Sequence, residues 1–222
     1  WFSWQRLGDT RLSLIQADYY LGMMEPARLA ALIPRQCAVT PVQFQLARRA
    51  WAAFTAPEPS AMRALFKHRT DALPFLRASI LRLLEEYPET VDGLSRTERG
   101  ILCVVASGVV SPPRIFQAWQ AYEPARFMGD SSFWQRMQFL TNAPVPALRV
   151  RAGTAFQLPQ HGRADTEFAA QQLELTDVGH ALLARQLDWA TLNGVDKWIG
   201  GARVSADNLW RWSALRQDIA RA

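Results

Sequence analysis

Three helix-start signals follow one another between residues 95 and 141, and they restrict the fold more than any other feature of the chain. An S-x-x-E capping box at 95–98 stands directly before an apolar run, which predicts a helix over about 96–107. A Ser-Pro pair at 111–112 predicts a second helix. A Gly-Asp pair at 129–130 gives a turn and an N-cap for a third, over about 131–141. Three successive short helices predict a small helical core in this half of the chain.

The third of these helices has a clear inner and outer face. Phe133, Met137 and Leu140 recur at i, i+4 and i+7, so we expect them to be buried, while Gln135 points to solvent. Short strands are then expected at 147–151 and 153–158 around a Gly turn, with a third strand at 173–175 and a further helix from 176.

The order helix, helix, helix, ribbon, strand, helix is that of a winged helix, a variant of the helix-turn-helix. The alternative is a generic helical bundle with a hairpin. The predicted class is α+β and mainly helical, with a truncated α/β-to-helical part before the winged-helix-like domain. Polar and turn-forming residues at 88–93 predict the boundary, giving domains over 1–91 and 92–222.

The end of the chain is predicted to form a Trp-rich β-hairpin. A Gly-Gly pair lies within one strand-like stretch at 198–204, and a second such stretch follows at 209–212. Pairing of these stretches makes Trp198, Trp210 and Trp212 available for cross-strand packing.

Positive charge is unevenly distributed along the chain. The 25 Lys and Arg residues exceed the 20 Asp and Glu residues, for a net charge of +5. Segment 95–163 carries eight arginines against three acids, whereas segment 164–222 carries six basic and eight acidic residues. The eight arginines are Arg96, Arg99, Arg114, Arg126, Arg136, Arg149, Arg151 and Arg163. Such a surplus can attract an anionic partner such as nucleic acid. The simpler explanation, an ordinary solvated surface, is the favoured one on charge alone.

A nucleic-acid interface follows if the third helix is a recognition helix. Its outward candidates are Ser132, Gln135, Gln138 and Arg136, because Gln pairs with adenine and Arg with guanine in the major groove. Arg149 and Arg151, beside the expected wing, are candidates for phosphate contacts. Winged helices also dock proteins, so a partner protein stays an open alternative.

A second hypothesis is an enzyme or small-ligand binder with a polar site between the two domains. Its candidate residues are Asp130, Asn193, Asp196 and Arg211. The simpler interpretation is that the Asn-Gly pair at 193–194 makes a turn that Asp196 caps.

The sequence offers no catalytic, metal or cofactor motif. Cys37 and Cys103 are the only cysteines and lack a C-x-x-C spacing, and the three histidines lie far apart. Both thiols are expected to be reduced, with Cys103 buried within an apolar helical pattern. Whether the chain is an enzyme is left open, with a non-enzymatic role favoured.

Several segments resemble the uncharacterised bacterial family of domain of unknown function 1835 proteins, with their companion C-terminal module. The most distinctive are Leu-Asn-Gly-Val-Asp-Lys-Trp-Ile-Gly-Gly at 192–201 and Trp-Arg-Trp at 210–212. Supporting segments lie at 72–76, 85–88, 93–99, 127–130, 133–134 and 175–179. The resemblance runs from about residue 12 onward and implies a shape and upstream sequence, but no activity.

The length and position of the apolar segments indicate where in the cell the protein is expected. The longest nearly apolar run, 101–110, is too short to cross a bilayer, and no leader pattern opens the sequence. The start at Trp1 without Met indicates that upstream residues are missing. We therefore expect a cytoplasmic bacterial protein, regulatory in role, that contacts nucleic acid or a partner protein and needs no membrane.

Overall fold

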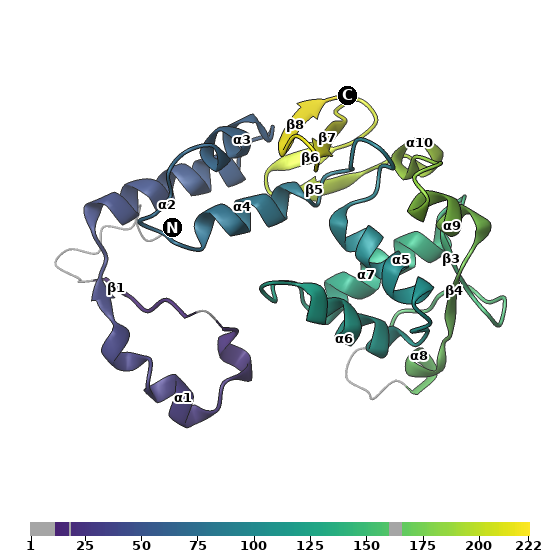
Figure 1. Cartoon of the computed structure of the whole chain (residues 1–222), viewed down its shortest axis with the longest axis horizontal. Coiled ribbons are helices and arrows are strands. Elements are labelled where there is room, and N and C mark those ends of the chain that lie inside the picture. Colours follow the sequence, from purple (N-terminus) through teal and green to yellow (C-terminus); the bar gives the residue numbers. More distant parts are fainter. Residues whose placement is uncertain (1–11, 18, 160–165) are drawn as a thin grey trace. The chain divides into compact units, whose positions relative to one another are not determined.

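A computed structural model describes residues 12–17, 19–159 and 166–222 (Figure 1). It confirms the α+β, mainly helical class, with 46% of the described residues in helices and 13% in strands. Each sheet is a two-stranded antiparallel pair. Among the described residues, no helix has the length and apolar character needed to pass through a bilayer.

The chain divides into two compact units, residues 1–81 and 82–222, so the division falls inside helix α4 (Leu76–Leu84). The predicted boundary at 91/92 lies within the second unit. Segment 88–90 belongs there because it pairs with the C-terminal strand β7 (Trp210–Ser213). The Trp212 N–H donates to the Pro88 carbonyl at 2.8 Å, and the Thr90 N–H donates to the Trp212 carbonyl at 2.9 Å.

The first unit consists of a minimal strand pair and helices. Strand β1 (Ser13–Leu14) pairs with β2 (Cys37–Ala38). The helical elements are η2 (Leu21–Met23), α1 (Pro26–Ala30), η3 (Ile33–Arg35), α2 (Pro41–Phe54) and α3 (Ser60–Phe66). Helix α2 begins with a capping box between Thr40 and Gln43.

The second unit is built on three helices, α5 (Arg96–Ala106), α6 (Pro112–Tyr122) and α7 (Asp130–Asn142). The predicted capping box of α5 is confirmed: the Ser95 hydroxyl accepts from the Glu98 N–H at 3.2 Å, and the Glu98 carboxylate accepts from the Ser95 N–H at 2.7 Å. These bonds satisfy two of the amides that every helix start leaves free.

Helix α7 confirms the predicted faces. Phe133, Met137 and Leu140 are fully buried, and Gln135 is exposed. The N-cap, however, is Gly129, and Asp130 is the first helical residue, its carboxylate accepting from the Ser131 N–H at 2.7 Å.

The strand pair after α7 differs from the predicted ribbon. Strand β3 (Leu148–Val150) pairs with β4 (Leu173–Leu175), and 153–158 is not a strand. The Asn142 side chain bonds both the N–H and the carbonyl of Phe156, each at 3.2 Å, so this segment packs on the end of α7 without a strand partner. The Leu173 N–H also donates to the Val110 carbonyl at 2.9 Å, which adds the α5–α6 connection to the edge of the pair. The remaining helices are α8 (Thr166–Ala170), α9 (Asp177–Leu183) and α10 (Trp189–Asn193).

The chain ends in two hairpins. The prediction that 198–204 and 209–212 pair with each other in one hairpin is therefore wrong. Strand β5 (Lys197–Ile199) pairs with β6 (Ala202–Val204) across a turn in which Gly200 has φ +60°. Strand β7 pairs with β8 (Asp218–Arg221), a strand that the sequence did not predict. Trp210 and Trp212 are buried, whereas Trp198 is 66% exposed.

Gly93 occupies a position that only glycine fits. Its φ is +68°, and an added Cβ would lie 2.6 Å from the Ala190 nitrogen and 2.6 Å from a carboxylate oxygen of Asp188. Close to it, the Trp189 N–H donates to the Asp92 carbonyl at 2.7 Å. Gly93 therefore lets the start of α5 approach the start of α10 closely.

Candidate functional site

The outer face of α7 carries the residues predicted to contact bases, but almost no positive charge. Ser132 and Gln135 are exposed, and Gln138 and Arg136 are half-buried. Arg136 lies near enough to Glu98 to help lower the pKa of that carboxyl group. Phe139, 38% exposed, meets the buried ring of Trp189 edge-on, with 5.6 Å between the ring centroids.

Both candidate phosphate contacts on the strand pair are held by one carboxylate. The Arg149 and Arg151 Nε atoms donate to the two oxygens of Glu174 at 2.7 and 3.0 Å. The hydrogen bond from Arg149 is the main cause that lowers the pKa of Glu174, and Arg151 adds to it. The two arginine side chains are 65% and 52% exposed, and with Glu174 they leave this surface one net positive charge.

The positive surplus of segment 95–163 is compensated within the second unit. Arg96 pairs with Glu85 at 2.7 Å, and Arg99 forms an ion pair with Asp92. Arg114 and Arg126 are exposed and form no ion pair with another described residue, and Arg163 lies outside the described ranges. Over residues 82–222, fifteen Lys and Arg residues stand against fifteen Asp and Glu residues, so the net charge of the chain belongs to the first unit.

The four candidates for a polar ligand site each serve a different local contact. The Asn193 amide bonds the N–H and carbonyl of Val145 at 2.9 and 3.0 Å. Asp196 accepts two bonds from Arg203 at 2.8 and 2.7 Å. Arg211 bonds the Asp188 carboxylate and the Glu89 carbonyl, and Asp130 bonds the Ser131 N–H. None of the four lines the pocket between α5 and α6 or the hollow beside Gly108.

A cluster of buried charges lies where α4 meets α5. Arg82 donates to Glu86 at 2.7 Å and to both oxygens of Glu123, with its side chain 13% exposed. The Thr97 hydroxyl donates to Glu86, and Arg96 lies 3.7 Å from Glu123. Glu123 thus receives two guanidinium groups, which compensate for its removal from water.

Glu98 is a second buried carboxylate, 1% exposed, with Lys197 Nζ 3.4 Å away. Burial raises the pKa of Glu98, but the charges of Lys197 and Arg136 and the hydrogen bonds from Ser95 outweigh this effect and hold the pKa below 4.5. A carboxyl group whose pKa is lower in the folded chain than in the unfolded chain stabilises the fold at pH values above its unfolded pKa. This contribution is lost as the pH falls through the folded pKa.

Glu98→Gln keeps the capping acceptor and removes the charge, so we expect a loss of about 2 kcal/mol in the free energy of unfolding at pH 7. The difference from wild type should shrink as the pH falls below 4.5, because protonation removes the same charge from the wild type. Urea unfolding of both proteins at pH 7, 5 and 3 measures this difference. Glu167→Gln, at an exposed position of α8, is the control that should change little. A Glu98→Gln difference that stays constant across pH would contradict the assignment.

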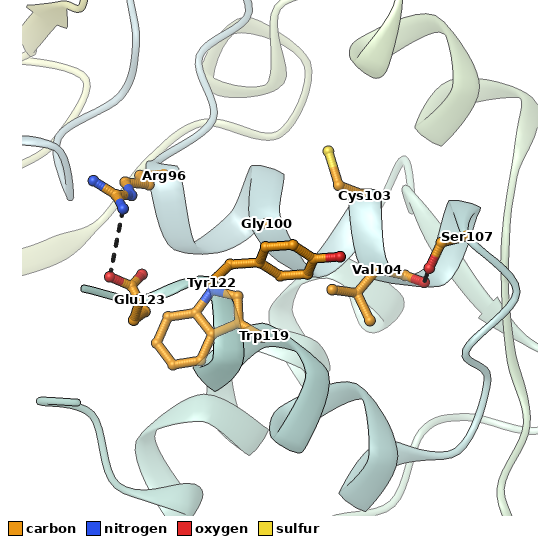
Figure 2. A pocket seen from close by; sticks show the side chains of 8 residues that line it. All are labelled: Arg96, Gly100, Cys103, Val104, Ser107, Trp119, Tyr122 and Glu123. Carbon is orange, nitrogen blue, oxygen red and sulfur yellow. Dashed lines mark hydrogen bonds and ion pairs between the residues drawn. The ribbon is translucent and has the colours of Figure 1, made fainter. Parts of the chain in front are cut away.

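A pocket of about 200 Å³ lies between α5 and α6 (Figure 2). One wall is a stripe of α5 with helical spacing and the other is the end of α6. The lining residues are Arg96, Gly100, Cys103, Val104, Ser107, Trp119, Tyr122 and Glu123. Cys103 is exposed here, so its predicted burial is wrong: it lies on this stripe and not on the inner face.

Sequence reasoning missed this pocket, although a signal for it exists. Residues 96, 100, 103 and 107 recur at intervals of four, three and four, which places them on one face of α5. Three of them are small, namely Gly100, Cys103 and Ser107. An added Cβ at Gly100 would lie 2.8 Å from the Trp119 ring, so the glycine allows α6 to approach. A second hollow, of about 480 Å³, lies near Gly108, Arg114 and Gln172.

Comparison of the chain with protein-family models, curated proteins and solved structures gives no match. The resemblance to the domain of unknown function 1835 proteins therefore stays a prediction. No group of three or more His, Cys, Asp and Glu side chains in the described ranges is placed to hold a metal ion.

Proposed function

We propose that residues 82–222 contain a winged-helix-like module of a regulatory protein, and that the outer face of α7 binds a partner protein. The order α5, α6, α7, β3, β4 supports the winged-helix assignment. So does the hydrogen bond from Leu173 to Val110, which brings an extended segment between α5 and α6 to the strand pair.

The near absence of positive charge on the outer face of α7 is the observation that favours a partner protein over nucleic acid. Its exposed residues include Ser131, Ser132, Gln135 and Phe139, and its one exposed charge is that of Asp130. Proteins that bind DNA specifically commonly neutralise several phosphates, and their interfaces are strongly basic. The cores of protein interfaces are instead depleted of charge and enriched in aromatic residues.

A photocrosslinking side chain at Gln135 tests this proposal in the native host. We expect an adduct that resists nuclease and is destroyed by protease, and no such adduct from the same group at Gln186, an exposed glutamine beyond α9. An adduct sensitive to nuclease, or equal adducts from both positions, would overturn the protein-binding proposal.

A titration with duplex DNA checks the same point on the purified chain. At 50 mM salt we expect no saturable binding that depends on α7, because residues 82–222 carry no net charge. Tight binding that weakens steeply with salt, and that Gln135→Ala and Arg149→Ala both reduce, would favour the nucleic-acid hypothesis.

A further inference from the structure

We propose that the pocket between α5 and α6 binds a small neutral molecule with one ring and one hydrogen-bond acceptor. This site lies in the second unit and is separate from the α7 face. Its volume, about 200 Å³, is somewhat larger than a cavity of about 150 Å³ that holds benzene in another protein. A single ring with a short polar substituent fits this space.

The polar group that points to a ligand is the indole N–H of Trp119. Trp119 is 3% exposed and lines the pocket, and its N–H forms no hydrogen bond with any described residue. The nitrogen lies 2.9 Å from where a Cβ on Gly100 would stand, so this edge of the ring packs closely against the bare Cα of Gly100 at the pocket wall. Figure 2 shows this edge of the ring turned toward Gly100 and Tyr122. This N–H lies on the pocket wall and no described residue accepts from it, so a ligand that brings an acceptor could bond it.

The walls of the pocket favour a flat ring. Trp119 forms the floor, and Tyr122, 77% exposed, extends across the opening toward Cys103 and Val104 (Figure 2). Aromatic side chains on two sides allow stacked or edge-on contacts with a bound ring. Because so much of Tyr122 is exposed, a ligand would cover apolar surface that is now in contact with water.

The charges at one end of the pocket exclude an ionic ligand. Arg96 already pairs with Glu85 at 2.7 Å and lies 3.7 Å from Glu123. Glu123 in turn is bonded by Arg82. An added anion would be repelled by the two glutamates, and an added cation would be repelled by the guanidinium groups, so a neutral molecule is preferred.

The two cysteines of the chain provide the measurement. Cys103 is exposed on the pocket wall, whereas Cys37 is exposed in the first unit and serves as an internal control. Iodoacetamide alkylates both thiols of the full chain, with and without acetophenone as the neutral probe. Mass spectrometry follows the alkylation rate at each cysteine. Benzoate and benzylammonium are the anionic and cationic probes of similar size. We expect acetophenone to slow alkylation at Cys103 at least threefold and to leave Cys37 unchanged.

Two variants separate binding from a general effect on the protein. Trp119→Phe keeps a ring and removes the N–H, so half-maximal protection should need a five- to tenfold higher acetophenone concentration. Tyr122→Ala removes an exposed side chain and should abolish most of the protection without affecting the fold. Equal slowing at both cysteines, no slowing up to the solubility of acetophenone, equal protection by benzoate or benzylammonium, or unchanged protection in Tyr122→Ala would each overturn the proposal.

Discussion

Replacement of Arg82 by methionine is expected to lower the free energy of unfolding by about 3–5 kcal/mol in urea denaturation at pH 7. Arg82 bonds Glu86 at 2.7 Å and Glu123 at 2.7 Å, and the side chains of these acids are only 8% and 3% exposed. Methionine retains the apolar stem and removes the guanidinium group, which also lies 4.5 Å from the centre of the Phe127 ring. Two buried carboxylates would then lose a counter-charge that solvent cannot replace.

The matched control for this variant is Arg203→Met. Arg203 bonds Asp196 with the same two-pronged geometry, at 2.8 and 2.7 Å, but the two side chains are 56% and 61% exposed. Ion pairs in contact with water are screened and contribute little to stability, so this variant should unfold almost like the wild type. Similar losses in both variants would show that burial is not what makes the Arg82 cluster important.

Gly93→Ala is expected to cost about 3–4 kcal/mol of unfolding free energy, measured in the same way. A left-handed backbone costs a residue with a Cβ about 1–2 kcal/mol. The remainder comes from overpacking, because the new Cβ would stand 2.6 Å from the Ala190 nitrogen and 3.0 Å from the Trp189 nitrogen. Relief of this clash would have to move the start of α10.

Gly153→Ala isolates the backbone part of this cost. Gly153 has φ +76°, close to the +68° of Gly93, but an added Cβ would meet no atom within 4 Å. Its expected cost is therefore about 1–2 kcal/mol. If Gly93→Ala were no more destabilising than Gly153→Ala, the close approach between the two helix starts would not matter for stability.

The helices were predictable because their signals are local. The capping box at Ser95 and Glu98 is formed as the sequence predicts, and the spacing of Phe133, Met137 and Leu140 matches the buried face of α7. Such signals depend on residues within one or two turns, so they survive in almost any tertiary context.

The pairings that the sequence did not predict depend on distant partners. The partner of Leu148 is Leu175, and no feature near either residue selects it over segment 153–158. The charges of Arg149 and Arg151 similarly suggest a phosphate contact until Glu174 is placed between them. The pocket was missed for the same reason, because the gap at Gly100 gains meaning only when Trp119 lies against it.

The last hairpin places segment 88–90, near the start of the second unit, close to the final strand of that unit. Segment 88–90 is bonded to β7, and β7 is paired with β8, so residue 89 and residue 219 stand about two strand spacings, or roughly 10 Å, apart. A short glycine-rich linker spans that distance. Residues 82–222 should therefore tolerate circular permutation, with new ends opened at an exposed turn such as the one at Gly153, and should also tolerate insertion as a single block into a surface loop of another protein.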